Sequence, residues 1–183
     1  TARDRFTRFG FQKTTVREIT EPVGIGEGTF YRFFDSKSAL YLRVLVREQD
    51  EVIDAVRADL EGLTDPAERL DRLFRTWTAE FERRPLLLRS HRAPRQLVRA
   101  VDGREVAELR DEVRDRVTPL IEDIQAGSDG YISEIRPEAM IELLSLLELV
   151  AANREAHDEL GWSGYETFKE VLITVLERGL LDR

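Results

Sequence analysis

The chain has 183 residues, of which 42% are hydrophobic and 35% are charged, and its formal net charge at pH 7 is -8. This length is enough for one large domain, or for a small domain joined to a medium one, with a buried core. Cysteine is absent, which excludes disulfides and thiolate metal sites and fits a reducing cytoplasm. No apolar run is long enough to cross a membrane and no signal peptide is visible, so we expect a cytoplasmic protein with no membrane partner.

Charge is distributed unevenly along the chain. Residues 1–44 contain eight Lys or Arg and five Asp or Glu, a net charge of +3, so the other 139 residues carry -11. Such asymmetry indicates one surface for polyanions and another that is kept away from them. Ordinary solvated charge is the alternative interpretation.

Two short helices joined by a glycine-marked turn are expected near the N-terminus. Thr15 and Glu18 have the spacing of a capping box, which predicts a helix that begins near Val16. Pro22 cannot donate a backbone hydrogen bond and its ring crowds the preceding turn, so this helix should end or kink there. The glycines of residues 24–26 permit the turn that follows.

The second of these helices is expected over residues 27–34. Phe30 and Phe34 share one face for packing, which leaves Thr29, Tyr31 and Arg32 to point outward. Helix, short turn and helix are typical of the helix-turn-helix motif, whose second helix enters the major groove of DNA.

The rest of the chain shows helical periodicity and no convincing strand alternation, which predicts an all-α fold. We expect a DNA-binding domain over residues 1–44 and a larger helical domain over residues 45–183. The helices predicted in this second part cover residues 38–60, 66–84, 85–100 with an interruption at Pro94, 103–126, 137–160 and 165–181.

The last two helices are apolar over more than one face. Residues 139–152 and 168–180 are too apolar for burial against a single core, which favours burial between domain and partner. The economical explanation is a two-fold dimer in which each subunit gives two helices to a four-helix bundle. The residues expected in this interface are Leu143, Leu147, Val150, Leu172 and Leu176.

Catalytic and metal-binding patterns find little support. No Ser lies in a nucleophile-elbow motif, and residues 24–28 lack the spacing and the preceding strand of a nucleotide-binding loop. His91 and His157 lie far apart, with no second His at helical spacing and no Cys. We therefore expect no catalytic residue, no metal site and no cofactor.

The N-terminal motif resembles the DNA-binding domain of the TetR family of bacterial transcriptional regulators, over about residues 2–45. Ala2 and Phe6 fit the family's first helix, and because the sequence begins inside that helix without Met, we expect a basic N-terminal arm to be missing from it. Thr20, Pro22 and Val23 replace small residues of the family pattern, and Gly26 replaces its Ser or Thr cap. The matching residues are Gly10, Phe11, Thr14, Thr15, Val16, Ile19, Gly24, Ile25, Gly28, Thr29, Phe30, Tyr31, Phe34, Ser36, Lys37 and Leu40.

The resemblance implies a homodimeric repressor that leaves a palindromic operator in double-stranded DNA when a small-molecule effector binds. Thr15, Lys37 and Tyr31 are expected to meet phosphates. Glu27 would accept a hydrogen bond from a cytosine amino group. The complete expected DNA-binding set is Thr15, Arg17, Gly26, Glu27, Gly28, Thr29, Tyr31, Arg32 and Lys37. The alternative function is a small-molecule sequestering protein that keeps the fold but has lost operator recognition, for which Pro22 is the best support.

The effector site is less defined by the sequence. Aromatic residues at helical spacing suit either a core or a cavity, and we expect a pocket lined by Phe74, Trp77, Phe81, His91 and Met140. The arginines between Arg83 and Arg99, which also include Arg84, Arg89, Arg92 and Arg95, have two interpretations. They either pair with neighbouring acids or form an entrance for an anionic ligand.

Overall fold

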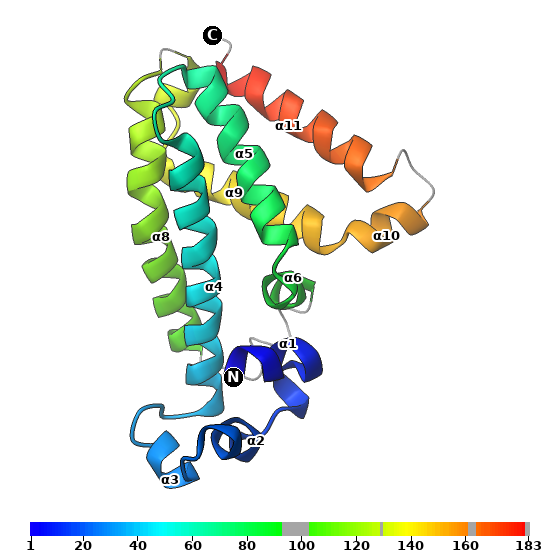
Figure 1. The fold of residues 1–183 in the computed structure, drawn as a ribbon. Helices are drawn as coiled ribbons and strands as arrows, with labels where there is room; N and C mark the ends of the chain where they lie inside the picture. Colours follow the sequence, from blue (N-terminus) through cyan, green and yellow to red (C-terminus); the bar gives the residue numbers. More distant parts are fainter. Residues whose placement is uncertain (93–102, 129, 161–163, 182–183) are drawn as a thin grey trace.

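The fold is taken from a computed structural model of the chain, which describes residues 1–92, 103–128, 130–160 and 164–181. The described residues form helices and connecting turns and include no strand, which confirms the all-α prediction (Figure 1). None of the described helices is long and apolar enough to pass through a bilayer.

The N-terminal helices form a small head. It contains α1 (Ala2–Lys13), α2 (Val16–Thr20), the 3-10 helix η1 (Glu21–Val23) and α3 (Glu27–Phe30). The predicted start of α2 at Val16 is confirmed, and so is its end before Pro22, because the chain passes into η1 at Glu21. Regular α-helix in α3 stops at Phe30, although backbone hydrogen bonds continue the helical turns as far as the amide of Phe34.

The remaining helices form the body. Its elements are α4 (Lys37–Leu60), α5 (Pro66–Glu82), α6 (Pro85–Arg92), α8 (Gly103–Gln125), the 3-10 helix η2 (Tyr131–Ser133), α9 (Pro137–Ala152), α10 (Arg154–Glu159) and α11 (Tyr165–Leu181). The predicted helix over residues 137–160 is divided at Asn153, which has non-helical backbone angles. Of the helix predicted over residues 85–100, the part that contains Pro94 lies outside the described residues.

Local capping explains where the body helices begin. The Ser36 hydroxyl accepts a hydrogen bond of 2.9 Å from the Ala39 amide at the start of α4. Asp65 accepts one of 2.8 Å from the Glu68 amide at the start of α5, where Pro66 fills the first helical position. These short polar caps satisfy amides that have no partner inside the helix.

Helix α4 connects the head to the body. Its first turns pack on α1, and further along it packs on α5 and α8, so the predicted domain boundary at residue 44 falls inside one continuous helix. Helix α9 lies against α5, α6 and α8, and α11 lies against α5. The short helix α6 lies between α1 of the head and the α5 and α9 helices of the body (Figure 1).

Candidate DNA-binding surface and ligand cavity

The capping box of α2 is formed as the sequence predicts. The Glu18 amide donates to the Thr15 hydroxyl oxygen at 3.3 Å, and the Thr15 amide donates to the Glu18 carboxylate at 2.8 Å. The hydrogen bonds from the backbone and hydroxyl of Thr15 lower the pKa of Glu18, so its carboxylate is charged at neutral pH. The Thr15 hydroxyl is therefore already engaged within the head, and its contact with phosphate stays a prediction.

The turn into α3 presents backbone and polar side chains to solvent. Gly24 has a positive φ of 71°, in the left-handed region that favours glycine. Gly26, Glu27 and Gly28 are exposed at the start of α3. A Cβ at Gly28 would meet no atom within 4 Å, so nothing inside the chain covers this backbone.

Phe30 anchors α3 while its neighbours face outward. The Phe30 ring is 2% exposed and packs on Phe34 with ring centroids 5.5 Å apart. Tyr31 is 53% exposed, Arg32 is also exposed, and Thr29 is half-buried. The predicted outward residues of the motif thus lie at the end of α3 and in the turn directly after it, and their contacts with DNA stay predictions.

Lys37 has a role inside the head that the sequence did not indicate. Its Nζ donates to the carbonyl oxygens of Phe11 at 2.9 Å and Thr14 at 2.7 Å. It also lies 4.4 Å from the centroid of the Phe11 ring, which favours a cation. Two of the three ammonium donors hold the C-terminal end of α1 in place, so the phosphate contact predicted for Lys37 is left to the third.

Another predicted cation, Arg17, is exposed on α2. Its Nε lies 3.8 Å from a Glu21 carboxylate oxygen, and both side chains face solvent, so this pair is weak. Arg17 is therefore available to a phosphate. In the first turn of α1, Arg3 pairs with Glu48 and Glu51 of α4, and these ion pairs connect the head to that helix.

A cavity of about 710 Å³ opens in the body between α4, α5, α6, α8 and α9. Apolar residues form most of its wall, including Leu45, Leu87, Val113, Val117 and Ile141. This volume lies within the range of small-molecule sites. Within the described residues, no group of three or more His, Asp and Glu side chains could hold a metal ion.

Two of the five residues predicted for the effector pocket, Trp77 and His91, line this cavity. Phe74, Phe81 and Met140 do not, because each is 0% exposed and packed into the core. Helical spacing placed all five on inward faces, but only the separation of the packed helices decides which of those faces meets a void.

A buried carboxylate forms the main polar feature of the cavity wall. Glu148 on α9 is 6% exposed. Its Oε1 accepts hydrogen bonds from Trp77 Nε1 at 3.0 Å and from Gln49 Nε2 at 3.1 Å. Its Oε2 lies 3.0 Å from His91 Nε2. Side chains of α4, α5 and α6 therefore converge on one group of α9, which we call the Glu148 cluster (Gln49, Trp77, His91 and Glu148).

The Glu148 cluster favours the protonated form of His91. Burial lowers the pKa of the ring, but the hydrogen bond and charge of Glu148, together with the Leu87 carbonyl, outweigh burial and raise the pKa above its ordinary value. His91 Nδ1 lies 3.1 Å from the Leu87 oxygen, so both ring nitrogens can donate when the ring is charged.

Gln49 and Glu148 were absent from the predicted site. The only signal for them was their position. Glu148 interrupts an apolar run of its helix, and Gln49 lies three or four residues from apolar side chains on the same face of its helix, namely Leu45, Val46, Val52 and Ile53. A buried carboxylate costs stability unless it is paired. A polar residue on an apolar helix face therefore indicates a partner on a neighbouring helix.

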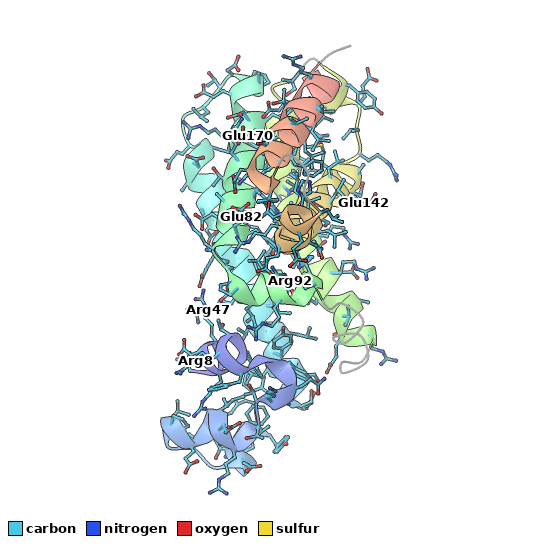
Figure 2. The ribbon with its side chains drawn as sticks, turned by 90° about the vertical axis from the view of Figure 1, so that its right-hand side faces the viewer. Arg8, Arg47, Glu82, Arg92, Glu142 and Glu170 are labelled. Atoms are coloured by element: carbon cyan, nitrogen blue, oxygen red, sulfur yellow. The ribbon has the colours of Figure 1, made fainter. Side chains whose placement is uncertain are left out.

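Arg83, Arg84 and Arg92 agree with the pairing interpretation. Arg83 and Arg84 each donate to the Glu80 carboxylate at 2.6 Å. Arg92 donates to the carbonyl of Ala152 and to the Glu155 carboxylate. Figure 2 shows Arg92 above Arg8 of the head and below Glu142 of α9. Arg95 and Arg99 lie outside the described residues.

The predicted dimer residues differ in their availability to a partner. Leu147 is 2% exposed inside the subunit, so its side chain already packs in the core of the single chain. Leu143, Val150, Leu172 and Leu176 are half-buried against the core. The apolar side chains that α9 and α11 leave most exposed are Leu146 at 44%, Leu149 at 46%, Val171 at 56% and Val175 at 61%.

Comparisons with known proteins agree with this geometry. The HTH-type transcriptional activator FasR of Mycolicibacterium smegmatis is 35% identical over 69 residues, which cover 38% of this chain and 32% of that protein. The HTH-type transcriptional regulator UidR of Escherichia coli K12 is 31% identical over 62 residues, which cover 34% of this chain and 32% of UidR. The matches thus span about a third of the length of these relatives.

Solved structures share the whole fold at low sequence identity. The fatty acid degradation regulator FadR from Bacillus halodurans has a TM-score of 0.66 and 18% identity, with 100% of this chain and 93% of that chain covered. A tetR-family regulatory protein from Rhodococcus RHA1 has a TM-score of 0.62 and 17% identity, covering 100% and 94%.

Residues 1–44 match the family model of bacterial regulatory proteins of the tetR family. They include all the helices of the head, with the capping box of α2 and the glycine turn before α3. The N-terminal helix-turn-helix domain is therefore of the kind found in the tetR family of bacterial regulatory proteins.

Proposed function

We propose that the chain is a ligand-responsive transcriptional repressor that binds a palindromic operator as a homodimer and leaves it when a small molecule enters the cavity. The observation that carries this proposal is the continuity of α4. Its first residue, Lys37, holds the head, and Leu45 and Gln49 of the same helix line the cavity. Eight residues of α-helix separate Lys37 from Leu45, a distance of about 12 Å along the axis.

Helix α6 provides a second connection between the cavity and the head. Leu87 and His91 line the cavity. Arg89 of the same helix reaches α1, where its Nη1 lies 3.3 Å from the position that a Cβ on Gly10 would occupy. A change in the cavity that moves α4 or α6 is therefore transmitted to helices that support the DNA-binding motif. Coupling of about 1 to 3 kcal/mol would change operator affinity roughly 5- to 150-fold.

The exposed apolar residues of α9 and α11 support dimerisation. Leu146 on α9 and Val171 and Val175 on α11 remain in solvent in the single chain. A two-fold axis beside these helices would bury them in a four-helix bundle. Two heads would then read half-sites about one turn of DNA apart, whereas one head would bind only weakly.

The test begins with the selection of duplex DNA by the wild-type protein from a random-sequence pool. We expect an enriched palindrome, sedimentation as a dimer at micromolar concentration, and repression from a promoter that carries this palindrome. The names of the relatives include both an activator and a repressor, so the promoter assay decides the sign. A pool without sequence enrichment would argue against a regulator.

Variants then separate dimerisation from folding. Val175→Glu places a charge at the apolar face and should give a monomer with operator affinity reduced at least tenfold, because a buried unpaired carboxylate costs several kcal/mol. Ala107→Glu, at an exposed position of the charged helix α8, is the matched control and should behave as wild type. A wild-type monomer that binds the operator tightly would overturn the dimeric architecture.

A further inference from the structure

The cavity combines a long apolar wall with one anionic polar point. Apolar side chains from α4, α6, α8 and α9 surround the void, and Glu148 is the carboxylate that lies deepest in its wall. The cluster around Glu148 draws on four helices, so the position of the carboxylate is fixed before any molecule enters.

Most hydrogen-bond donors of the inner wall are already used, and one of the two amide hydrogens of Gln49 is taken by Glu148. Trp77 donates to Glu148, and both nitrogens of His91 face acceptors. The Ser90 hydroxyl donates to the Leu87 carbonyl at 2.7 Å, and the Ser145 hydroxyl donates to the Ile141 carbonyl at 3.0 Å. An occupant that needs donors from these groups would have to break existing bonds.

The Glu148 carboxylate can accept one more hydrogen bond than the cluster supplies. A carboxylate has about four acceptor positions. Glu148 uses two on Oε1 for Trp77 and Gln49, and one on Oε2 for His91. One position on Oε2 is open, and the oxygens of Ser90 and Ser145 can also accept. The inner wall therefore suits an occupant that donates.

Beside Glu148 the cavity wall disfavours an anion, because the cation in contact with this carboxylate, His91, is already paired with it. Glu138, Glu142 and Glu148 all line the cavity. Of the two lining arginines, Arg114 is bound to Asp111 at 2.8 Å, while Arg110 is exposed to solvent on α8. A second negative charge placed beside the poorly hydrated Glu148 would be repelled more strongly than in water.

We propose that the cavity selects an apolar molecule with a hydrogen-bond-donating head, an ammonium or hydroxyl group, and that Glu148 accepts the bond from this head. The proposal rests on the cavity being the effector site of the proposed function. Carboxylate-headed molecules with the same apolar body bind more weakly, because their head meets the charge of Glu148, and His91 beside it is already paired.

The test uses three probes with one apolar chain, namely octylammonium, 1-octanol and octanoate, titrated into the full chain by calorimetry. We expect octylammonium to bind at least tenfold more tightly than octanoate, with octanol between them. Trp77 fluorescence should change with the first two probes, because its indole donates to the same carboxylate.

Two carboxamide variants locate the selection. Glu148→Gln keeps the shape and an acceptor oxygen but removes the charge, so it should abolish the preference of ammonium over hydroxyl. Glu122→Gln, on an exposed carboxylate of α8 that does not line the cavity, should retain the wild-type ranking. Tightest binding of octanoate by wild type, or an unchanged ranking in Glu148→Gln, would overturn the proposal. If Glu148→Gln fails to fold, the wild-type ranking alone decides.

Operator binding is measured separately with each probe. Binding in the expected order without any change in operator affinity would uphold the ligand class and refute the ligand response proposed above. Operator binding that persists while none of the probes binds would refute the ligand class and leave the DNA-binding function standing.

Discussion

Replacement of Lys37 by methionine removes the ammonium that holds the end of α1 but keeps a similar apolar stem. The ammonium donates to the carbonyls of Phe11 and Thr14 at 2.9 and 2.7 Å. Hydrogen bonds that involve a charged group contribute about 1.5 to 3 kcal/mol each. Burial opposes this gain, as the lowered pKa of Lys37 shows. We therefore expect Lys37→Met to lower the free energy of unfolding by about 2 kcal/mol in total.

The measurement is urea unfolding followed by far-ultraviolet circular dichroism, with Lys13→Met as the control. Lys13 is exposed in the last turn of α1, and its replacement should change stability by less than about 0.5 kcal/mol. The same two variants are titrated with the selected operator at several salt concentrations. Loss of one phosphate contact would make the slope of log affinity against log salt shallower by about 1.

These two readouts separate the roles of Lys37. Equal urea midpoints for wild type and Lys37→Met would refute the argument that its ammonium supports α1. A less stable variant with an unchanged salt slope would instead refute the phosphate contact predicted from the sequence. Both changes together would mean that the third donor of the ammonium reaches DNA.

Three further changes test backbone strain and proton linkage. Gly10→Ala should cost about 1 to 3 kcal/mol, because φ 77° and ψ 168° belong to a region that is almost restricted to glycine, and an unchanged melting temperature would contradict this. His91 has a raised pKa, so its pairing with Glu148 stabilises the fold below pH 6.5 and this contribution is lost as pH rises through the folded pKa. His91→Gln should therefore cost more stability at pH 5.5 than at pH 8.5, and an equal cost would count against the pair. Burial, followed by the hydrogen bond with Asp71, raises the pKa of Glu177 to about 7, so the stability of its protonated form is lost as pH rises through that value. Glu177→Gln should be more stable than wild type by about 1 to 2 kcal/mol at pH 8.5 and similar to it at pH 5, and an advantage only at pH 5 would reverse this argument.

The parts of the fold that were predicted correctly depend on interactions between residues close in sequence. The capping box needs only Thr15 and Glu18, and the end of α2 follows from Pro22. The bounds of α11 at Tyr165 and Leu181 also agree with the sequence prediction. Helix starts, turns and amphipathic faces are determined by residues a few positions apart. The head could therefore be recognised from the sequence.

The features that the sequence did not show depend on contacts across long stretches of the chain. An apolar helix such as α9 can turn Leu147 toward the core or toward a partner subunit. Only the packing of α9 shows that Leu147 faces the core. Trp77 and Phe74 are likewise close on α5, yet only Trp77 meets the void. The internal role of Lys37 joins residues 23 and 26 positions apart. Periodicity gives the inward face of a helix but not what lies opposite that face.

The burial of Glu148 costs folding free energy, and the position of its partner His91 suggests what this carboxylate contributes instead. A buried ion pair is often no more stabilising than apolar residues of the same volume, so a carboxylate 6% exposed is weak evidence for stability as such. Its partner His91, however, stands on α6, and Arg89 of that helix lies against the strained backbone of Gly10 in α1. A donor head that takes the open position on Glu148 Oε2 shares this oxygen with His91. The occupant therefore acts directly on the helix that touches the head, which an apolar wall in the place of Glu148 would not provide.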